Sequence, residues 1–144
     1  MSWRSLQEWG RSWFPQEQAT HLRTGRLGES AARDYLRDQG LKFLTANFRA
    51  KRGEIDLIFR DGDCLVFVEV KTRSSESWTR PAASVNARKR KLISRTALAY
   101  LRGLNEPRVR IRFDIVEVLV AEGKVGEIRH LPNTFSLSPP YRFG

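Results

Sequence analysis

The pattern of hydrophobic and polar positions predicts two helices and five strands. Apolar side chains at helical spacing predict one helix from Arg26 to Gln39 and another from a cap at Ser84 to about Leu101. Apolar runs and alternation predict strands over 41–48, 55–59, 64–70, 109–120 and 125–131. The order of these elements predicts an α/β fold with a mixed central β-sheet flanked by helices.

The predicted strands at 55–59 and 64–70 are joined by turn-forming residues at 61–63, which is the pattern of a β-hairpin. Three charged side chains interrupt these apolar runs: Asp56, Glu69 and Lys71. Burying charge in a sheet is unfavourable unless the charge is paired or binds a metal. These three residues therefore need a chemical explanation.

Alternation along the second strand places Glu69 and Lys71 on one face of the hairpin. A two-residue loop, at 61–62 or at 62–63, brings Asp56 to that face. With the loop at 62–63, Asp56 is directly opposite Glu69. With the loop at 61–62, Asp56 is one pair away from Glu69. A three-residue loop would separate the two acids unless a bulge restored the phase.

Two carboxylates so close together repel each other, and a divalent cation that prefers oxygen ligands would relieve the repulsion. Mg²⁺ is the usual ion where phosphate is the substrate. Lys71, two residues after Glu69, can orient or deprotonate a water molecule beside such an ion.

Asp56 followed by Glu69-Val70-Lys71 resembles the metal-binding core of the PD-(D/E)xK nucleases, the restriction-endonuclease-like superfamily that includes archaeal Holliday junction resolvases. The tripeptide alone is common by chance, but the wider sequence from about Arg23 to Phe135 resembles the small bacterial YraN-like family of this superfamily. The residues that carry this resemblance are Gly28-Glu29, Asn47, Arg49, 53–58, 67–71, Arg73 and 112–114. Ile55 stands where the superfamily name has Pro, which is common in the group.

The resemblance implies a restriction-endonuclease-like fold and a nuclease that depends on Mg²⁺ or Mn²⁺. Asp56, Glu69 and Lys71 would be catalytic. The metal ligands would be Asp56, Glu69, the Val70 carbonyl and Glu29, which matches a helical Glu of the resolvase-like branch. Glu29 can also be explained as a first-turn acid favoured by the helix dipole. Glu54, on the face of Asp56, is a weaker candidate for supporting the ligands.

The chain has 26 Lys and Arg against 16 Asp and Glu, a formal charge of +10, which predicts a polyanionic partner. Nucleic acid is expected, with DNA favoured over RNA. A membrane surface is the rival polyanion, and charge alone does not separate the two, but a membrane usually requires a strongly amphipathic basic helix, so no membrane partner is expected. The candidate phosphate contacts are Arg49, Lys51, Arg52, Arg73, Arg88, Lys89 and Lys91. Solvated loops and helix faces have the same composition. Four consecutive cations at 88–91 span every face of a helix, so at most two or three can follow one phosphate track.

The length of 144 residues predicts a single folded domain. We expect a Trp-rich N-terminal extension over 1–22, a nuclease-like domain over 23–135 and a flexible tail over 136–144. The three Trp of the extension recur at helical spacing, which is typical of packing, although base stacking and dimerisation would use the same pattern. No apolar signal core or membrane-span segment is present in the sequence, so a cytoplasmic protein is predicted.

Four further residues have structural explanations. Cys64 is the one cysteine, and its apolar neighbours predict a buried structural thiol. Asp114 is predicted to pair with Arg112 or another base, and His130 to be a hydrogen-bonded structural histidine. The polar segment around Trp78 is predicted to be a mobile loop at the mouth of the site, where Trp78 touches substrate or covers the core.

Three functions fit the sequence. The first is a metal-dependent nuclease acting on DNA, including branched or single-stranded substrates. The second is a non-catalytic nucleic-acid-binding protein that keeps the nuclease fold. In the third, the charges at 56, 69 and 71 form a self-neutralising ladder on an exposed sheet face. Resolvase-like relatives dimerise, which leaves a homodimer open.

Overall fold

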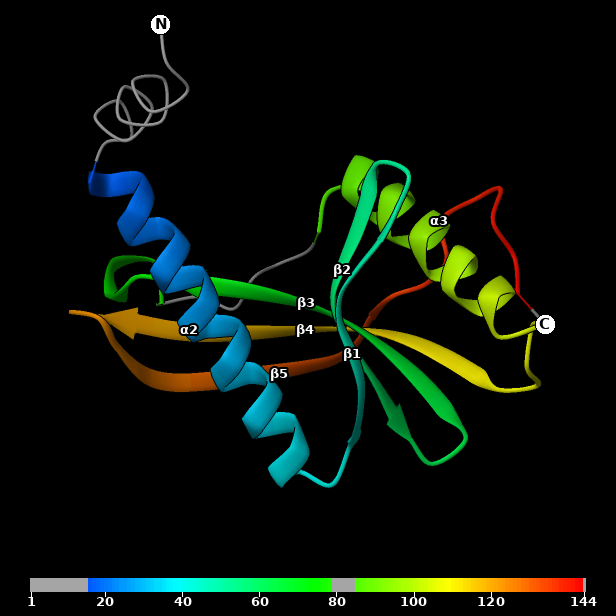
Figure 1. Cartoon of the computed structure of the whole chain (residues 1–144), viewed down its shortest axis with the longest axis horizontal. Coiled ribbons are helices and arrows are strands. Elements are labelled where there is room, and N and C mark those ends of the chain that lie inside the picture. The colour runs from blue at the N-terminus through cyan, green and yellow to red at the C-terminus, as the bar shows by residue number, and fades with distance from the viewer. Residues whose placement is uncertain (1–15, 79–84, 144) are drawn as a thin grey trace, which may run out of the picture.

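The computed structural model describes residues 16–78 and 85–143, which form one mixed sheet with a helix on either side (Figure 1). The elements are α2 (Gln16–Asp38), β1 (Lys42–Ala50), β2 (Gly53–Asp61), β3 (Cys64–Arg73), the short 3₁₀ helix η1 (Ser75–Ser77), α3 (Ala87–Gly103), β4 (Arg110–Ala121) and β5 (Lys124–Phe135). The strand order is β1-β2-β3-β4-β5, with β3 and β4 parallel and the other pairs antiparallel. The predicted α/β class is confirmed, and the arrangement is compatible with a restriction-endonuclease-like fold.

The β2–β3 hairpin has one of the two predicted registers. Asp61 pairs with Cys64 across a Gly62-Asp63 turn, and the ladder continues as far as Leu57 opposite Val68. Gly62 has a φ of +60°, a conformation that glycine adopts without strain. The next positions along this register are 56 and 69, so Asp56 and Glu69 lie at the same level, just beyond the last paired residues of the hairpin.

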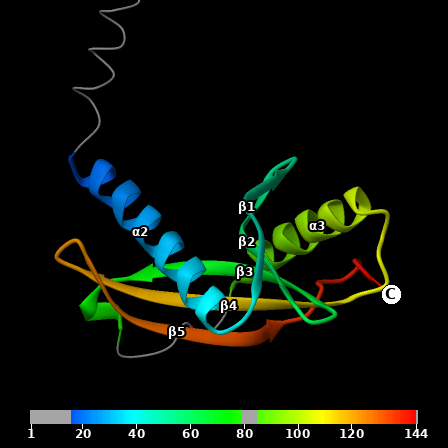
Figure 2. The same cartoon turned by 60° about the horizontal axis from the view of Figure 1, so that its bottom comes forward.

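Alternate residues of β2 and β3 pack into two separate cores. Leu57 and Val68 belong to the core that α2 covers, whereas their neighbours Ile58 and Phe67 belong to the core that α3 covers. Because successive side chains of a strand point to opposite faces, the two helices cover opposite faces of this ladder. Figure 2 shows β1 and β2 rising between the two helices.

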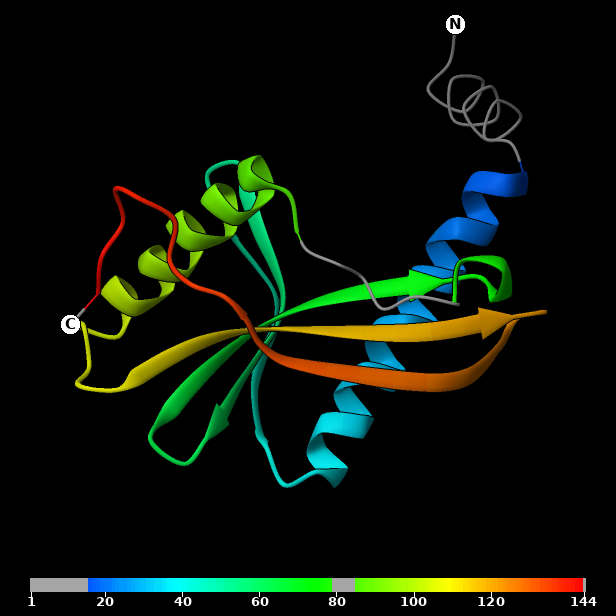
Figure 3. The ribbon, with the colours of Figure 1, turned by 180° about the vertical axis from the view of Figure 1, so that it is seen from behind.

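The C-terminal segment returns to α3. Figure 3 shows it leaving β5 and passing beside the helix, where the Ser138 N–H donates a hydrogen bond to Ser94 Oγ at 3.0 Å. Leu137 and Phe143 pack against the core on this side of the sheet. Neither of the two described helices is both long enough and apolar enough to cross a lipid bilayer.

Both helices begin elsewhere than predicted. α2 starts at Gln16, because residues 16–19 are strong helix formers that carry no apolar stripe for periodicity to detect. α3 starts at Ala87, and the prediction of a cap at Ser84 is wrong. Asn86 is the cap instead, and its side chain accepts a hydrogen bond from the Lys89 N–H at 2.9 Å. Ser84 itself and the three Trp of the predicted N-terminal extension lie outside the described residues.

The predictions for the buried polar groups of β3, β4 and β5 are confirmed. Asp114 is fully buried and accepts hydrogen bonds from Arg112 at 3.1 Å, from His130 Nε2 at 2.7 Å and from the Asn133 N–H at 2.9 Å. Burial alone would raise the pKa of Asp114, but the hydrogen bonds from His130 and Arg112 outweigh it and lower the pKa. Cys64 is buried, which raises the pKa of its thiol.

Gly28 allows α2 to approach β3 closely. A Cβ at this position would lie 2.2 Å from Thr72 Oγ1. We expect Gly28→Ala to lower the free energy of unfolding by about 1 kcal/mol, because overpacking exceeds the gain in helix propensity. Denaturant unfolding of Gly28→Ala and of Gly28→Ala/Thr72→Ala measures this. The double variant should recover the loss, since the Thr72 side chain supplies every close atom, and an uncorrected loss would contradict the assignment.

Candidate active site

Asp56 lies on β2 where the strand parts from β3. Its Oδ2 accepts a hydrogen bond from the Val70 N–H at 2.8 Å. Burial and then the negative charge of Glu69 raise the pKa of Asp56 from 3.8 to about 7, and the charge of Glu29 adds to the effect. Carboxylates from β2, β3 and α2 therefore act on one another at this point.

Glu69 of β3 is buried, with 7% of the residue exposed. Its Oε1 forms an ion pair with Lys89 Nζ, which comes from the first turn of α3. A buried carboxylate is strongly unfavourable without a cation, and Lys89 supplies one. Lys89 was a predicted phosphate contact, and it is instead engaged with one of the predicted metal ligands.

Glu29 is half-buried and lies in the turn of α2 that contacts β3 through Gly28. Because α2 begins at Gln16, Glu29 lies in the middle of the helix, so the explanation of Glu29 as a first-turn acid is wrong. Burial raises the pKa of its carboxyl, and the negative charges of Glu54 and Glu69 raise this pKa further. A hydrogen bond with the Asn47 side chain opposes the rise. Glu29 therefore lies in the same electrostatic neighbourhood as the hairpin acids.

Lys71 of β3 is half-buried and is the register partner of Glu117 on the parallel strand β4. Burial lowers the pKa of its amine, and the positive charges of Arg73 and Lys89 lower it further. Glu69 and Glu117 oppose this change. A lysine whose pKa is lowered is better suited to exchange a proton near neutral pH than an exposed lysine.

The chemistry of these residues fits a Mg²⁺ ion that is shared with a substrate. In the parts of the chain that the structure describes, no group of three or more His, Cys, Asp and Glu side chains is placed to hold a metal ion. Mg²⁺ is commonly bound by one or two carboxylates, with waters and substrate phosphates completing its shell. Asp56 and Glu69 are two such carboxylates. The Val70 carbonyl stays a predicted ligand.

A second buried acid, Glu117, is the register partner of Lys71, and the sequence patterns did not single it out. Glu117 is fully buried and its carboxylate is contacted by Arg73 at 3.2 Å and by Arg129 at 4.0 Å. The ring of Trp78 lies 3.8 Å from the Arg129 guanidinium, and its Nε1 donates to Glu127 at 3.1 Å. Trp78 thus covers this end of the sheet, and Arg73 has a structural partner. The signal for Glu117 in the sequence was its position as the one acid within the apolar run 115–120.

The other predicted phosphate contacts separate into two sets. Arg49 is exposed and pairs at 3.4 Å with Glu54, its register partner on β2. Lys51 and Arg52 are exposed in the turn between β1 and β2. A shallow hollow of about 340 Å³ brings part of the predicted set together with a further arginine, and it is lined by Arg52, Arg88, Lys91, Leu92 and Arg95.

The site lies within the region that the chain shares with its relatives. The model of the family described as "Uncharacterised protein family UPF0102" matches residues 28–118. A UPF0102 protein of Trichlorobacter lovleyi is 42% identical over 115 residues, which cover 79% of this chain and 91% of the relative. The corresponding protein of Chlorobaculum parvum is 46% identical over 116 residues, covering 77% and 90%. That of Rhodococcus opacus is 38% identical over 117 residues, covering 81% and 99%. The chain therefore belongs to the UPF0102 family, the YraN-like family that its motifs resemble.

Proposed function

We propose that this protein is a nuclease that hydrolyses phosphodiester bonds with the help of Mg²⁺ or Mn²⁺, with DNA favoured over RNA. One observation carries the proposal. The hairpin register brings Asp56 and Glu69 to the same level on one face, and burial together with the charge of Glu69 raises the pKa of Asp56. The mutual repulsion of two such carboxylates is what a divalent cation relieves.

Each residue has a distinct role in this proposal. Asp56 and Glu69 hold the ion with the Val70 carbonyl as a further ligand, and Glu29 adds negative charge beside them. The ion supplies a Lewis acid that stabilises negative charge on the scissile phosphate. Lys71 positions the attacking water or stabilises the charge that develops on the phosphate oxygens. The Val70 N–H fixes the orientation of the Asp56 carboxylate through its 2.8 Å hydrogen bond.

Lys89 has a place in the same proposal. Its ammonium neutralises Glu69, one of the two acids that would hold the ion. The Lys89 side chain is 50% exposed, so its ammonium can exchange the carboxylate for a substrate phosphate. This would reconcile the ion pair with the predicted phosphate contact.

A non-catalytic nucleic-acid-binding protein is the second candidate. The ion pair between Lys89 and Glu69 favours it, because the Lys89 ammonium already neutralises this buried acid. Such a protein would bind nucleic acid equally well in EDTA and after Glu69→Gln. The charge-ladder function required an exposed sheet face, whereas Glu69 is buried.

A cleavage panel tests the proposed function. Linear, branched and single-stranded DNA and an RNA are each incubated with the protein in Mg²⁺, Mn²⁺ or EDTA. We expect cleavage of at least one DNA with either ion, no cleavage in EDTA, and none by Asp56→Ala or Lys71→Ala. Lys42→Ala, at an exposed position on β1, is the matched control and should cleave normally. Cleavage that persists in the two site variants would contradict the proposed site.

A further inference from the structure

We infer that the outer face of α3 is a binding track for the phosphate backbone of double-stranded nucleic acid, running from the acidic site to the opposite end of the helix. The inference rests on the proposed function in one respect: the proposed function identifies the polyanion as nucleic acid. It gives a role to Arg95, Arg102 and Arg108, none of which the sequence analysis selected.

The cations of α3 are aligned on one face. At about 100° per residue, Arg88, Lys91, Arg95 and Arg102 fall within about 60° of one another around the helix axis. The buried residues of α3, which include Ile93, Ala97 and Leu101, lie on the opposite side and pack against the sheet. The four cations therefore form a stripe that points away from the core.

The charge of this stripe is not compensated within the described parts of the chain. α3 contains no acidic residue over its 17 positions. Among the described residues, none of the four stripe cations forms an ion pair, a hydrogen bond or a ring contact through its side chain. Lys89, in the same turn, differs because it pairs with Glu69. A helix face with uncompensated charge of one sign is suited to bind a polyanion.

Two hollows lie along the stripe. Arg52, from the turn between β1 and β2, joins Arg88, Lys91 and Arg95 around the first hollow, next to the start of α3. A second hollow of about 800 Å³ lies at the other end of the helix. Arg88, Lys91 and Arg95 line the first hollow, and Arg102 lines the second, where the acids Asp63 and Glu106 are also lining residues. Cations of the stripe are therefore present at both ends of α3.

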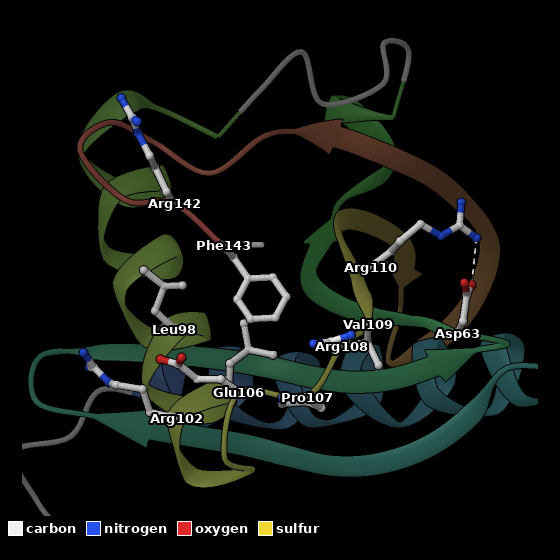
Figure 4. Close-up of a pocket in the computed structure, with 11 residues that line it drawn as sticks. Asp63, Leu98, Arg102, Glu106, Pro107, Arg108, Val109, Arg110, Arg142 and Phe143 are labelled. Carbon is white, nitrogen blue, oxygen red and sulfur yellow. Dashed lines mark hydrogen bonds and ion pairs between the residues drawn. The ribbon is translucent and has the colours of Figure 1, made fainter.

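The second hollow has a distinct composition. Its floor is apolar: in Figure 4 the ring of Phe143 lies between Leu98 of α3 and Val109. Arg102, Arg108, Arg110 and Arg142 are further lining residues of the hollow, and among them Arg110 is paired with Asp63 at 2.8 Å. Arg102 and Arg108 are exposed and continue the stripe beyond α3.

The dimensions and chemistry of the stripe fit a duplex. Arg88 and Arg102 are 14 residues apart, which corresponds to about 21 Å along a helix and to roughly six base-pair steps of B-form DNA. Proteins that bind single strands combine cations with exposed aromatic side chains for base stacking. The one aromatic residue of α3, Tyr100, packs instead against Phe48 and Phe67 on the core side. Backbone contact without stacking favours double-stranded substrate.

Salt-dependent binding tests this inference without any cleavage. Fluorescence anisotropy in EDTA measures the affinity of the full chain for a 16-base-pair duplex and for a single strand of equal length at several salt concentrations. Arg88→Gln/Lys91→Gln/Arg95→Gln should reduce the slope of log K against log salt by about 3 for the duplex, and weaken binding on the order of 100-fold at 0.1 M salt. Arg23→Gln/Arg26→Gln/Lys124→Gln removes the same charge from exposed positions on α2 and at the start of β5. Its slope should change by less than about 1.

Three outcomes would overturn the inference: equal losses in the two triple variants, tighter binding of the single strand, or no binding by the parent chain. Circular dichroism and thermal unfolding verify that each variant folds. If the first triple variant does not fold, Arg95→Gln alone should reduce the slope by about 1. Because binding in EDTA requires neither an ion nor hydrolysis, a protein that binds along α3 without cleaving would contradict the proposed nuclease and not this inference.

Discussion

Lys71→Met is expected to lower the rate of Mg²⁺-dependent cleavage by a factor of about 10² to 10⁴. Methionine keeps the length and apolar stem of the side chain but removes the amine. Lys71 is half-buried among Glu69, Arg73, Glu117 and Lys89, so the fold should tolerate the change. Single-turnover cleavage of the best substrate in the panel measures the effect, and equal ion affinity of the two proteins would assign it to chemistry.

Lys71→Arg distinguishes the two roles proposed for this amine. If Lys71 stabilises negative charge, arginine should retain part of the activity, because it remains charged at every accessible pH. If Lys71 takes a proton from water, arginine should be as inactive as methionine, and the parental rate should rise with pH through the lowered pKa of Lys71. Full activity of Lys71→Met would contradict both roles.

Asp56→Asn is expected to stabilise the ion-free protein at pH 8 by about 2 to 4 kcal/mol. The pKa of Asp56 is raised from 3.8 to about 7 on folding, so its protonated form is favoured in the folded protein. The contribution of Asp56 to stability is fully present below pH 3.8 and is lost as the pH rises through about 7. Asparagine carries no charge and keeps an oxygen that can accept the Val70 hydrogen bond.

Urea unfolding in EDTA at pH 4 and pH 8 measures this difference. The two proteins should be nearly equal at pH 4 and should diverge at pH 8. Adding Mg²⁺ at pH 8 should stabilise the parent, because an ion bound to the folded state favours that state, and should have little effect on Asp56→Asn. An equal gain for both proteins would mean that the ion binds elsewhere.

The central hairpin could be predicted from the sequence because its signals are local. The period of 2 along 64–70, the turn residues at 61–63 and the glycine at 62 specify the strands and limit the register to two possibilities. The position of Asp56 beside Glu69 follows from that register. Family resemblance then supplied Glu29, which no local pattern in the sequence connects to the hairpin.

The partners of the buried charges could not be predicted, because they depend on contacts between distant segments. Lys89 reaches Glu69 only because α3 packs across the hairpin, and Arg73 reaches Glu117 only because β3 and β4 are parallel neighbours. Four consecutive cations at 88–91 look alike in the sequence. Lys89 forms an ion pair, Arg88 and Lys91 point outwards and Arg90 is half-buried, and this separation depends on which side of α3 meets the sheet.

A calorimetric titration of the metal-free protein with Mn²⁺ tests the central claim most directly, namely that Asp56 and Glu69 together hold a divalent cation beside Lys71. We predict one ion bound per chain, with at least a tenfold loss of affinity in Asp56→Asn and in Glu69→Gln. Asp63→Asn, an exposed acid in the turn of the same hairpin, should bind like the parent. No binding heat in the parent, or the same affinity in all four proteins, would contradict the claim.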